Sequence, residues 1–349
     1  MTHQNVFDPR TMQTRMQTRM ETLHDWLAIT MPNKNYHLQR IAGDASFRQY
    51  FRLTQNNQTF IVMDAPPEQE DCKPFINITK RLLQAQINVP KIMAQNLPKG
   101  FLLLSDLGNI HYFDQLKQAD ITPEHATALY GNAINVLLKL HERLNTKGLP
   151  LYNKKLLIQE MDLFKHWLLQ EYIGIALTKQ IQNILDTIFN LLAHEALSQP
   201  QIFVHRDYHS RNLIWNKSGD PGVLDFQDAV AGPITYDLVS LLKDCYIKWP
   251  KQQIQQWAND YFMQIAKYHT NIEQEKFMRW FNLMGVQRHL KASGIFARLH
   301  LRDHKSHYLQ EIPRTLSYII DLGNDYPELE ELIQYIQNQV IPSISRSNR

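Results

Sequence analysis

The chain has 349 residues, and 37 lysines and arginines against 34 acidic residues give it a formal net charge of +3. A balance this close to neutral excludes the strong positive field typical of nucleic-acid-binding proteins, so no nucleic acid is expected as a partner. A hydrophobic content of 44% and a charged content of 20% are typical of a soluble globular protein, and no obligate protein partner is evident. The length suffices for two lobes, each with a buried core.

The two cysteines, Cys72 and Cys245, lie far apart, so the sequence predicts neither a disulfide framework nor a zinc site. A reducing cytoplasm is therefore the expected location. The first 30 residues contain no sustained apolar segment before their charges, and no signal peptide is expected. No apolar run approaches the roughly 20 residues of a membrane span, so we expect no membrane association.

The N-terminal part of the chain predicts one helix and a small antiparallel sheet. Residues 10–30 place Met12, Met16, Met20, Leu23 and Leu27 at helical intervals, a stripe that usually packs on a core. Three β-rich segments follow at 36–41, 47–53 and 59–63, separated by short hairpin-like joins.

A hinge is predicted after the next helix, at about 73–86, the extended segment 89–94 and the apolar strand 101–104. The polar link 105–108 ends in glycine, and such a link is typical of the join between two lobes, although it is equally compatible with a connector that binds nothing. The predicted division is an N-terminal lobe at 1–104, a hinge at 105–108 and a C-terminal lobe at 109–349.

The C-terminal lobe is predicted to be mostly helical. Thr122 and Pro123 are an N-cap and a first helical residue, and the apolar period continues to about Leu144. Further helices are expected near 159–172, 178–196, 234–247, 251–268, 274–298, 307–321 and 327–339. The fold class is therefore α+β, with a small antiparallel β lobe and a large helical lobe.

Residues 202–228 carry the pattern with the clearest chemistry. An apolar run ends in His205-Arg206-Asp207, and Asn212 follows the aspartate after four residues. In this spacing the aspartate orients or receives the proton of a hydroxyl, and the asparagine amide oxygen holds Mg²⁺. The sequence therefore predicts ATP-dependent phosphoryl transfer on a bilobal, protein-kinase-like fold.

A hairpin is predicted from Asn212 to Asp225. If its turn centres between residues 218 and 219, Asn212 lies directly opposite Asp225. Opposed residues have Cβ atoms roughly 5 Å apart, a separation that one divalent cation can bridge. The alternative is that these polar residues merely cap and turn a surface hairpin.

The segments HRDYHSRNL, DFQ and GPITYDLVSLL resemble the aminoglycoside phosphotransferase and choline kinase superfamily. The segments GDASFRQYFRL, FLLLSDLG and VLDFQDAVAGPITYDLVSLLKD are similar to the bacterial anomeric N-acetylmuramate/N-acetylglucosamine kinases of cell-wall recycling. This resemblance implies an enzyme that uses ATP to phosphorylate the C1 hydroxyl of the free amino sugar.

The resemblance also implies roles for particular residues. Asp207 is the implied catalytic base, Asn212 and Asp225 are the implied Mg²⁺ ligands, and Asp237 is implied to hydrogen-bond the backbone of the catalytic loop. His205 is expected to brace that loop. His209 and Asp228 flank the site and are candidates for contact with the sugar.

The implied nucleotide site lies in the N-terminal lobe. The carbonyl of Ser105 and the N–H of Leu107 would hold adenine, and the loop around Ser46 and Phe47 would cover the phosphates. This loop contains a single glycine, so a plain turn remains the alternative. Met63 occupies the position of the strand-three lysine of kinases, and Arg48 or Arg52 is the nearest cation that could replace that lysine.

Three other functions compete with this one. A protein kinase needs an activation loop, and only a few residues separate Asp225 from Gly232. An aminoglycoside kinase calls for acidic pockets, whereas residues 276–314 contain eight lysines and arginines, which suit a carboxylate-bearing sugar or form a solvated helix face. The missing lysine makes a non-catalytic, nucleotide-binding pseudokinase an alternative, and the intact Asp207, Asn212 and Asp225 argue against it.

Overall fold

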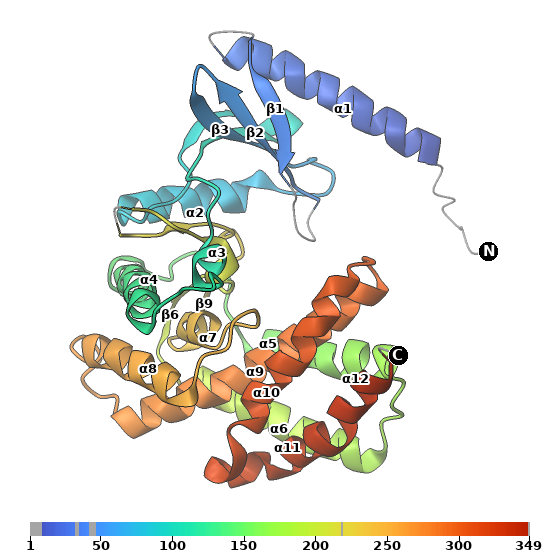
Figure 1. The fold of residues 1–349 in the computed structure, drawn as a ribbon, viewed down its shortest axis with the longest axis vertical. Helices are drawn as coiled ribbons and strands as arrows, with labels where there is room; N and C mark the ends of the chain where they lie inside the picture. The colour runs from blue at the N-terminus through green and yellow to red at the C-terminus, as the bar shows by residue number, and fades with distance from the viewer. Residues whose placement is uncertain (1–8, 32–34, 42–46, 218, 348–349) are drawn as a thin grey trace. The chain divides into compact units, whose positions relative to one another are not determined.

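The computed structural model describes residues 9–31, 35–41, 47–217 and 219–347, without the side chains of residues 9–16, 324 and 347 (Figure 1). The chain forms two compact units. The first comprises residues 1–77 and 90–107, and the second comprises residues 78–89 and 108–349.

The first unit contains a five-stranded antiparallel sheet with the strand order β1-β2-β3-β5-β4. Its strands are β1 (His37–Ile41), β2 (Gln49–Gln55), β3 (Gln58–Asp64), β4 (Ile92–Asn96) and β5 (Phe101–Ser105). The predicted N-terminal helix is confirmed as α1 (Pro9–Thr30). The predicted small antiparallel sheet is confirmed as well.

The two faces of this sheet differ in their surroundings. Phe51 and Val62 are opposed across β2 and β3, and both pack in one core with Leu23 and Leu27 of α1. Since neighbouring residues of a strand point to opposite faces, Met63 lies on the face away from α1. Met12 and Met16, predicted to share the helix stripe, have side chains outside the described residues.

The second unit is predominantly helical, as predicted. Helix α2 (Cys72–Gln84) is divided between the two units after Asn77. The α- and longer π-helices of the second unit are α3 (Tyr112–Leu116), α4 (Pro123–Arg143), α5 (Lys154–Leu163), the π-helix η2 (Phe164–Tyr172), α6 (Lys179–Leu197), α7 (Tyr236–Leu242), α8 (Lys251–Ile265), α9 (Gln274–Leu301), α10 (Glu311–Ile320), α11 (Glu330–Tyr335) and α12 (Ile341–Ser347). Helix α9 is buried on nearly all sides because α5, α6, α7 and α10 pack around it.

Short strands hold the segment that carries the catalytic motif. Strand β6 (Gln201–Val204) pairs with β9 (Val230–Pro233), and β7 (Leu213–Ile214) pairs with β8 (Gly222–Val223). The predicted hairpin exists, but its predicted register is wrong by one residue. Leu213 lies opposite Val223, so Asn212 lies opposite Leu224 and not Asp225.

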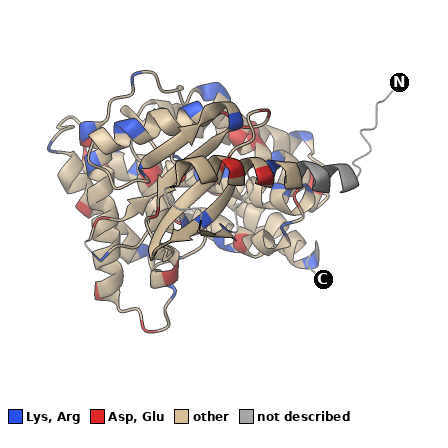
Figure 2. Ribbon diagram, turned by 90° about the horizontal axis from the view of Figure 1, so that it is seen from above, with Lys and Arg blue, Asp and Glu red and all other residues tan. Residues whose placement is uncertain are grey.

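Charged residues are dispersed along the chain, as Figure 2 shows for lysines and arginines in blue and acidic residues in red. This dispersion fits the small net charge. In the part of the chain that the structure describes, no helix combines the length and the apolar character needed to cross a bilayer.

Gly294 allows α9 to approach the junction of α5 and η2 closely. A Cβ atom at Gly294 would lie 2.2 Å from the carbonyl carbon of Leu163 and 2.4 Å from the backbone nitrogen of Phe164. Both neighbours are backbone atoms, which cannot move aside as a side-chain tip can. Gly131 of α4 offers a contrast, since a Cβ atom there would meet nothing within 4 Å.

We expect Gly294→Ala to destabilise the protein by about 1–3 kcal/mol or more, because the methyl group forces two helices apart. Gly131→Ala is the matched control, and it should stabilise by up to about 1 kcal/mol, since alanine has less backbone freedom to lose. Chemical denaturation of both variants measures the two changes. Equal effects of the two substitutions would contradict the close approach at Gly294.

Candidate active site

The predicted catalytic residues lie on one segment of the second unit, whose two ends are joined because they form paired strands. Strands β6 and β9 pair at its base, with Val204 opposite Val230, and the β7–β8 pair lies within it. Asp207, Asn212 and Asp225 all fall between these paired strands. The fold therefore fixes both ends of the segment that carries them.

Asp237 holds the start of the catalytic loop from the first turn of α7. Its Oδ2 accepts a hydrogen bond from the backbone N–H of His205 at 2.6 Å, and its Oδ1 accepts one from that of Arg206 at 2.9 Å. The predicted structural role of Asp237 is thus confirmed. Arg206 has φ 78°, a left-handed conformation that costs a bulky residue about 1–3 kcal/mol. The two hydrogen bonds help to offset that cost.

His205 links the catalytic loop to the strand that precedes Asp225. Its Nδ1 accepts a hydrogen bond from the backbone N–H of Asp207 at 3.2 Å, and its Nε2 donates to the carbonyl of Leu224 at 2.9 Å. One donor and one acceptor require a neutral ring. Burial lowers the pKa of His205 to about 4, which keeps the ring neutral at physiological pH. The expected bracing role of His205 is confirmed.

Asp244 holds the far end of the same loop, and the sequence reasoning missed it. Its Oδ2 accepts hydrogen bonds from the backbone N–H and the hydroxyl of Ser210. Asp244 follows Asp237 by seven residues and lies two residues beyond the end of α7 at Leu242, so the helix and the segment that follows it each bring one carboxylate to the loop. An acidic residue just after an apolar helix is the signal that could have revealed it.

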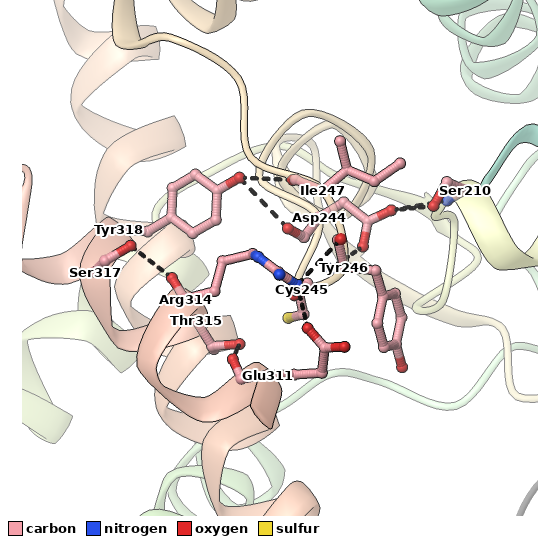
Figure 3. Close-up of polar contacts among 10 residues, drawn as sticks. All are labelled: Ser210, Asp244, Cys245, Tyr246, Ile247, Glu311, Arg314, Thr315, Ser317 and Tyr318. Carbon is pink, nitrogen blue, oxygen red and sulfur yellow. Dashed lines mark hydrogen bonds and ion pairs between the residues drawn. The ribbon is translucent and has the colours of Figure 1, made fainter. Parts of the chain in front are cut away.

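Helix α10 fixes the backbone around Asp244, as Figure 3 shows. Arg314 donates to the carbonyls of Cys245 and Tyr246 at 3.3 and 3.1 Å. The hydroxyl of Tyr318 donates to the carbonyl of Ile247 at 3.0 Å. Contacts with α10, as well as the connection to α7, therefore fix the position of Asp244.

Buried positive charges surround Asp207. Burial alone would raise the pKa of Asp207, but the charges of Lys291 and Arg288 from α9, together with Arg206, lower it to about 2. Asp207 is therefore ionised at neutral pH and can accept a hydrogen bond from an incoming hydroxyl. A carboxylate of such low pKa is a weak base that accepts hydrogen bonds more readily than it takes up a proton.

Two of these cations share a buried carboxylate. Lys291 Nζ lies 3.0 Å from Oε1 of Glu160, and Arg206 forms an ion pair with the same oxygen. The hydroxyl of Tyr152 donates to Oε2 of Glu160. Partnered buried charges of this kind hold their geometry, because breaking a pair leaves an uncompensated charge.

Asn212 is oriented by its own loop. Its Nδ2 donates to the carbonyl of Asp207 at 2.9 Å, which assigns the other amide atom as the oxygen acceptor. Its backbone carbonyl accepts from the N–H of Leu224 at 2.9 Å. Asp225 follows with φ 61°, and its Oδ1 accepts from Nε2 of Gln227 at 2.8 Å.

The oxygen donors of Asn212 and Asp225 fit a magnesium ion. An amide oxygen and a carboxylate are hard ligands, and Mg²⁺ in phosphotransferases usually takes one or two carboxylates together with waters and phosphate oxygens. Among the described residues, no group of three or more histidine, cysteine, aspartate or glutamate side chains could hold a metal by itself. This donor set therefore suits an ion that shares its coordination with a phosphorylated ligand.

The two candidate sugar contacts differ in their surroundings. The His209 ring packs edge-on against Tyr246, with centroids 5.5 Å apart, and its Nδ1 is buried without a hydrogen-bond partner among the described residues. Asp228 is exposed, and its predicted contact with the sugar stays a prediction.

The predicted nucleotide-binding residues belong to the first unit. Phe47 is 62% exposed, whereas Ser46 lies outside the described residues. Ser105 and Lys91 are joined by two hydrogen bonds, each of 2.8 Å, which fix the end of β5 before Leu107. Arg48 forms an ion pair with Glu70 at 2.9 Å.

A small antiparallel sheet, a large helical unit and the ordered His205-Arg206-Asp207 segment define a phosphotransferase of the protein-kinase-like class. Solved structures share this fold. An ethanolamine kinase from Plasmodium vivax aligns with a TM-score of 0.61 and 13% identity over 90% of this chain and 91% of its own. A spectinomycin phosphotransferase, solved with ADP and spectinomycin, aligns with a TM-score of 0.59 and 13% identity over 94% and 98%.

Sequence comparison identifies the family. Residues 37–273 match the phosphotransferase enzyme family, and the chain belongs to it. A Pseudomonas putida protein named N-acetylmuramate/N-acetylglucosamine kinase is 43% identical over 86% of this chain and 87% of its own length. A Neisseria meningitidis protein of the same name is 38% identical over 90% and 94%. The resemblance noted in the sequence is confirmed.

Proposed function

We propose that this phosphotransferase uses ATP to phosphorylate the anomeric C1 hydroxyl of N-acetylmuramate, N-acetylglucosamine or both, in peptidoglycan recycling. The observation that carries the proposal is the 43% identity, over most of both chains, to a relative named for those two sugars. The ordered catalytic segment of the second unit supports it. The product would be the sugar 1-phosphate.

In this proposal Asp207 is the catalytic base. A sugar hydroxyl is a poor nucleophile, so most of the catalysis comes from positioning and electrostatic stabilisation. Asp207 would accept the hydrogen bond of the C1 hydroxyl and orient its oxygen toward the phosphoryl group. His205 and Asp237 would act through the loop by holding the Asp207 backbone in place.

Asn212 and Asp225 would hold Mg²⁺ through their oxygen atoms. When bound, the ion neutralises charge on the phosphate oxygens. Gln227 supports this role, since its hydrogen bond to Oδ1 of Asp225 restricts the rotation of the carboxylate.

The nucleotide would bind to the first unit. We place the adenine at the carbonyl of Ser105 and the N–H of Leu107, and the phosphates under the loop around Ser46 and Phe47. The hydrogen bonds between Ser105 and Lys91 support the adenine site, because they fix the strand end that leads into the hinge.

Arg48 is the better candidate for the cation that replaces the missing strand-three lysine. Tyr50 is opposed to Met63 on the sheet face away from α1. Both Arg48, just before β2, and Arg52 share the alternation of Tyr50, so the partners of the two arginines distinguish them. Arg48 also pairs with Glu70, just before α2, as the kinase lysine pairs with a helix glutamate. Arg52 is engaged instead by Asp106 of the hinge, at 2.7 Å.

We expect Arg48→Met to lower kcat/KM for ATP by roughly tenfold or more, since a charge-assisted contact to phosphate contributes about 1.5–3 kcal/mol. Arg52→Met is the matched control, because it removes an arginine of the same region that pairs with the hinge, and its effect should be smaller. Initial rates at varied ATP concentration measure both. A larger loss in Arg52→Met would assign the phosphate contact to Arg52.

An assay with different acceptors distinguishes the proposed function from two alternative functions. An aminoglycoside or other small-alcohol kinase of the same fold would label its own acceptor in preference to amino sugars, and a pseudokinase would turn over no ATP with either. The aminoglycoside phosphotransferases among the solved structures share only 13–17% identity with this chain, which supports the fold and not the substrate.

The test incubates the protein with ATP, Mg²⁺ and each free amino sugar, beside the 1-O-methyl glycosides and an aminoglycoside. We expect phosphorylation of the free sugars alone, because methylation blocks the C1 oxygen. Asp207→Asn should lower kcat by about 10²–10⁴-fold with little change in ATP binding. Equal labelling of blocked and free sugars would rule out transfer to C1.

A further inference from the structure

Arg288 of α9 is a buried cation whose hydrogen-bonding capacity is largely unused. Its side chain lies in the core, with 6% of the residue exposed. Its Nη1 donates weakly to Sγ of Cys245 at 3.6 Å, and its Nε has no hydrogen-bond partner among the described residues. A guanidinium carries five N–H donors, so most of those of Arg288 have no acceptor among the described residues.

Arg288 stays charged in this environment. Burial alone would lower the pKa of Arg288, but Cys245, Tyr236 and Asp207 raise it above its ordinary value. The carboxylates of Asp207 and Asp244 act on Arg288 through their charge, but neither forms an ion pair with it among the described residues, so its N–H donors lack charged acceptors. Lys291 and Arg206 differ in this respect, since both are paired with Glu160.

Arg288 lies beside the catalytic loop. Cys245, which it contacts, directly follows Asp244, and Asp244 binds Ser210 in that loop. Three residues further along α9, Lys291 reaches the Glu160 that pairs with Arg206, next to Asp207. One face of α9 therefore flanks the loop at both positions, and the charge of Arg288 acts on Asp207 directly.

The neighbouring groups suit a sugar ring. The Tyr246 ring packs against His209, whose Nδ1 is buried without a hydrogen-bond partner among the described residues, and carries the Arg211 guanidinium 3.6 Å from its centre. Phe113 and Phe296 also pack against the Tyr246 ring, so a sugar would meet its edge and the unsatisfied Nδ1 of His209 and not an open aromatic face.

We propose that Arg288 determines the acceptor specificity of this enzyme by binding the lactyl carboxylate of N-acetylmuramate while Asp207 holds its C1 hydroxyl. The inference rests on the proposed function. N-Acetylglucosamine has the same ring without the lactyl group, so it makes no use of the guanidinium. Arginine binds a carboxylate through two parallel N–H donors, which a lysine cannot reproduce.

The experiment measures kcat/KM for N-acetylmuramate and for N-acetylglucosamine and takes their ratio. We expect Arg288→Gln to lower this ratio roughly tenfold or more, because the lost contact is charge-assisted. Arg288→Lys should lower the ratio less. Arg298→Gln is the matched control and should leave the ratio unchanged, since Arg298 also has a buried, unpartnered Nε but has Arg302 and Asp303 as its charged neighbours.

A measurement on the unaltered protein guards against a misfolded variant. The carboxamide of N-acetylmuramate keeps the shape of the lactyl group but loses its charge, and its kcat/KM should fall by the same factor as the ratio does in Arg288→Gln. An unchanged ratio in Arg288→Gln, or full activity with the carboxamide, would overturn the proposed role of Arg288 and leave the proposed function standing. Failure of the unaltered protein to phosphorylate either sugar would overturn the proposed function and this inference with it.

Discussion

The catalytic segment depends on one carboxylate that receives two successive backbone amides. Asp237 accepts the N–H groups of His205 and Arg206, and the second of these residues has the left-handed conformation that turns the chain toward Asp207. Burial raises the pKa of Asp237 to about 7, although its two backbone hydrogen bonds act to lower it. Hydrogen bonds to the charged form contribute about 1.5–3 kcal/mol each, enough to offset the strain at Arg206. Without them, the loop would have to hold a strained residue by the ion pair with Glu160 alone.

Helix α7 and the segment that follows it contact this loop at two positions. Asp237 of α7 binds the beginning of the loop, and Asp244, two residues beyond the helix, binds Ser210 near its end. Arg314 of α10 in turn fixes the carbonyls that follow Asp244. The position of the loop therefore depends on successive contacts that connect it to the helices of the core.

The electrostatics of the site follow from the residues that α9 presents. Lys291 is neutralised by Glu160, whereas Arg288 has only a weak hydrogen bond to Cys245. Together they keep Asp207 ionised, as a hydrogen-bond acceptor requires. The two cations therefore differ in their proposed roles. Lys291 holds Glu160 in the structure, whereas Arg288 is proposed to bind the substrate.

Much of the fold could be predicted from local sequence patterns. The antiparallel sheet, α1 and most of the helices follow from periodicity and capping residues, and Asp207 and Asn212 from their spacing. The hairpin register could not be predicted, because β7 and β8 contain two residues each and long-range contacts from His205 and Asn88 set their position.

The residues that support the site were harder to find. Asp244 and Arg288 act through partners that are distant in sequence, and the missing lysine gave no hint that Arg48 pairs with Glu70. Sequence patterns report the periodicity of single elements, whereas these contacts depend on how α7, α9 and α10 pack together.

The most direct test of this account measures Asp237→Asn. Asparagine keeps the shape of the side chain but replaces one acceptor oxygen by an N–H₂ donor, which would face a backbone N–H. We expect the amides of His205 and Arg206 to exchange with solvent at least tenfold faster, as a loss of about 1.4 kcal/mol implies, and kcat to fall with them while the β6–β9 amides stay protected. Unchanged exchange at these two amides, together with an unchanged kcat, would contradict the dependence of the catalytic loop on Asp237.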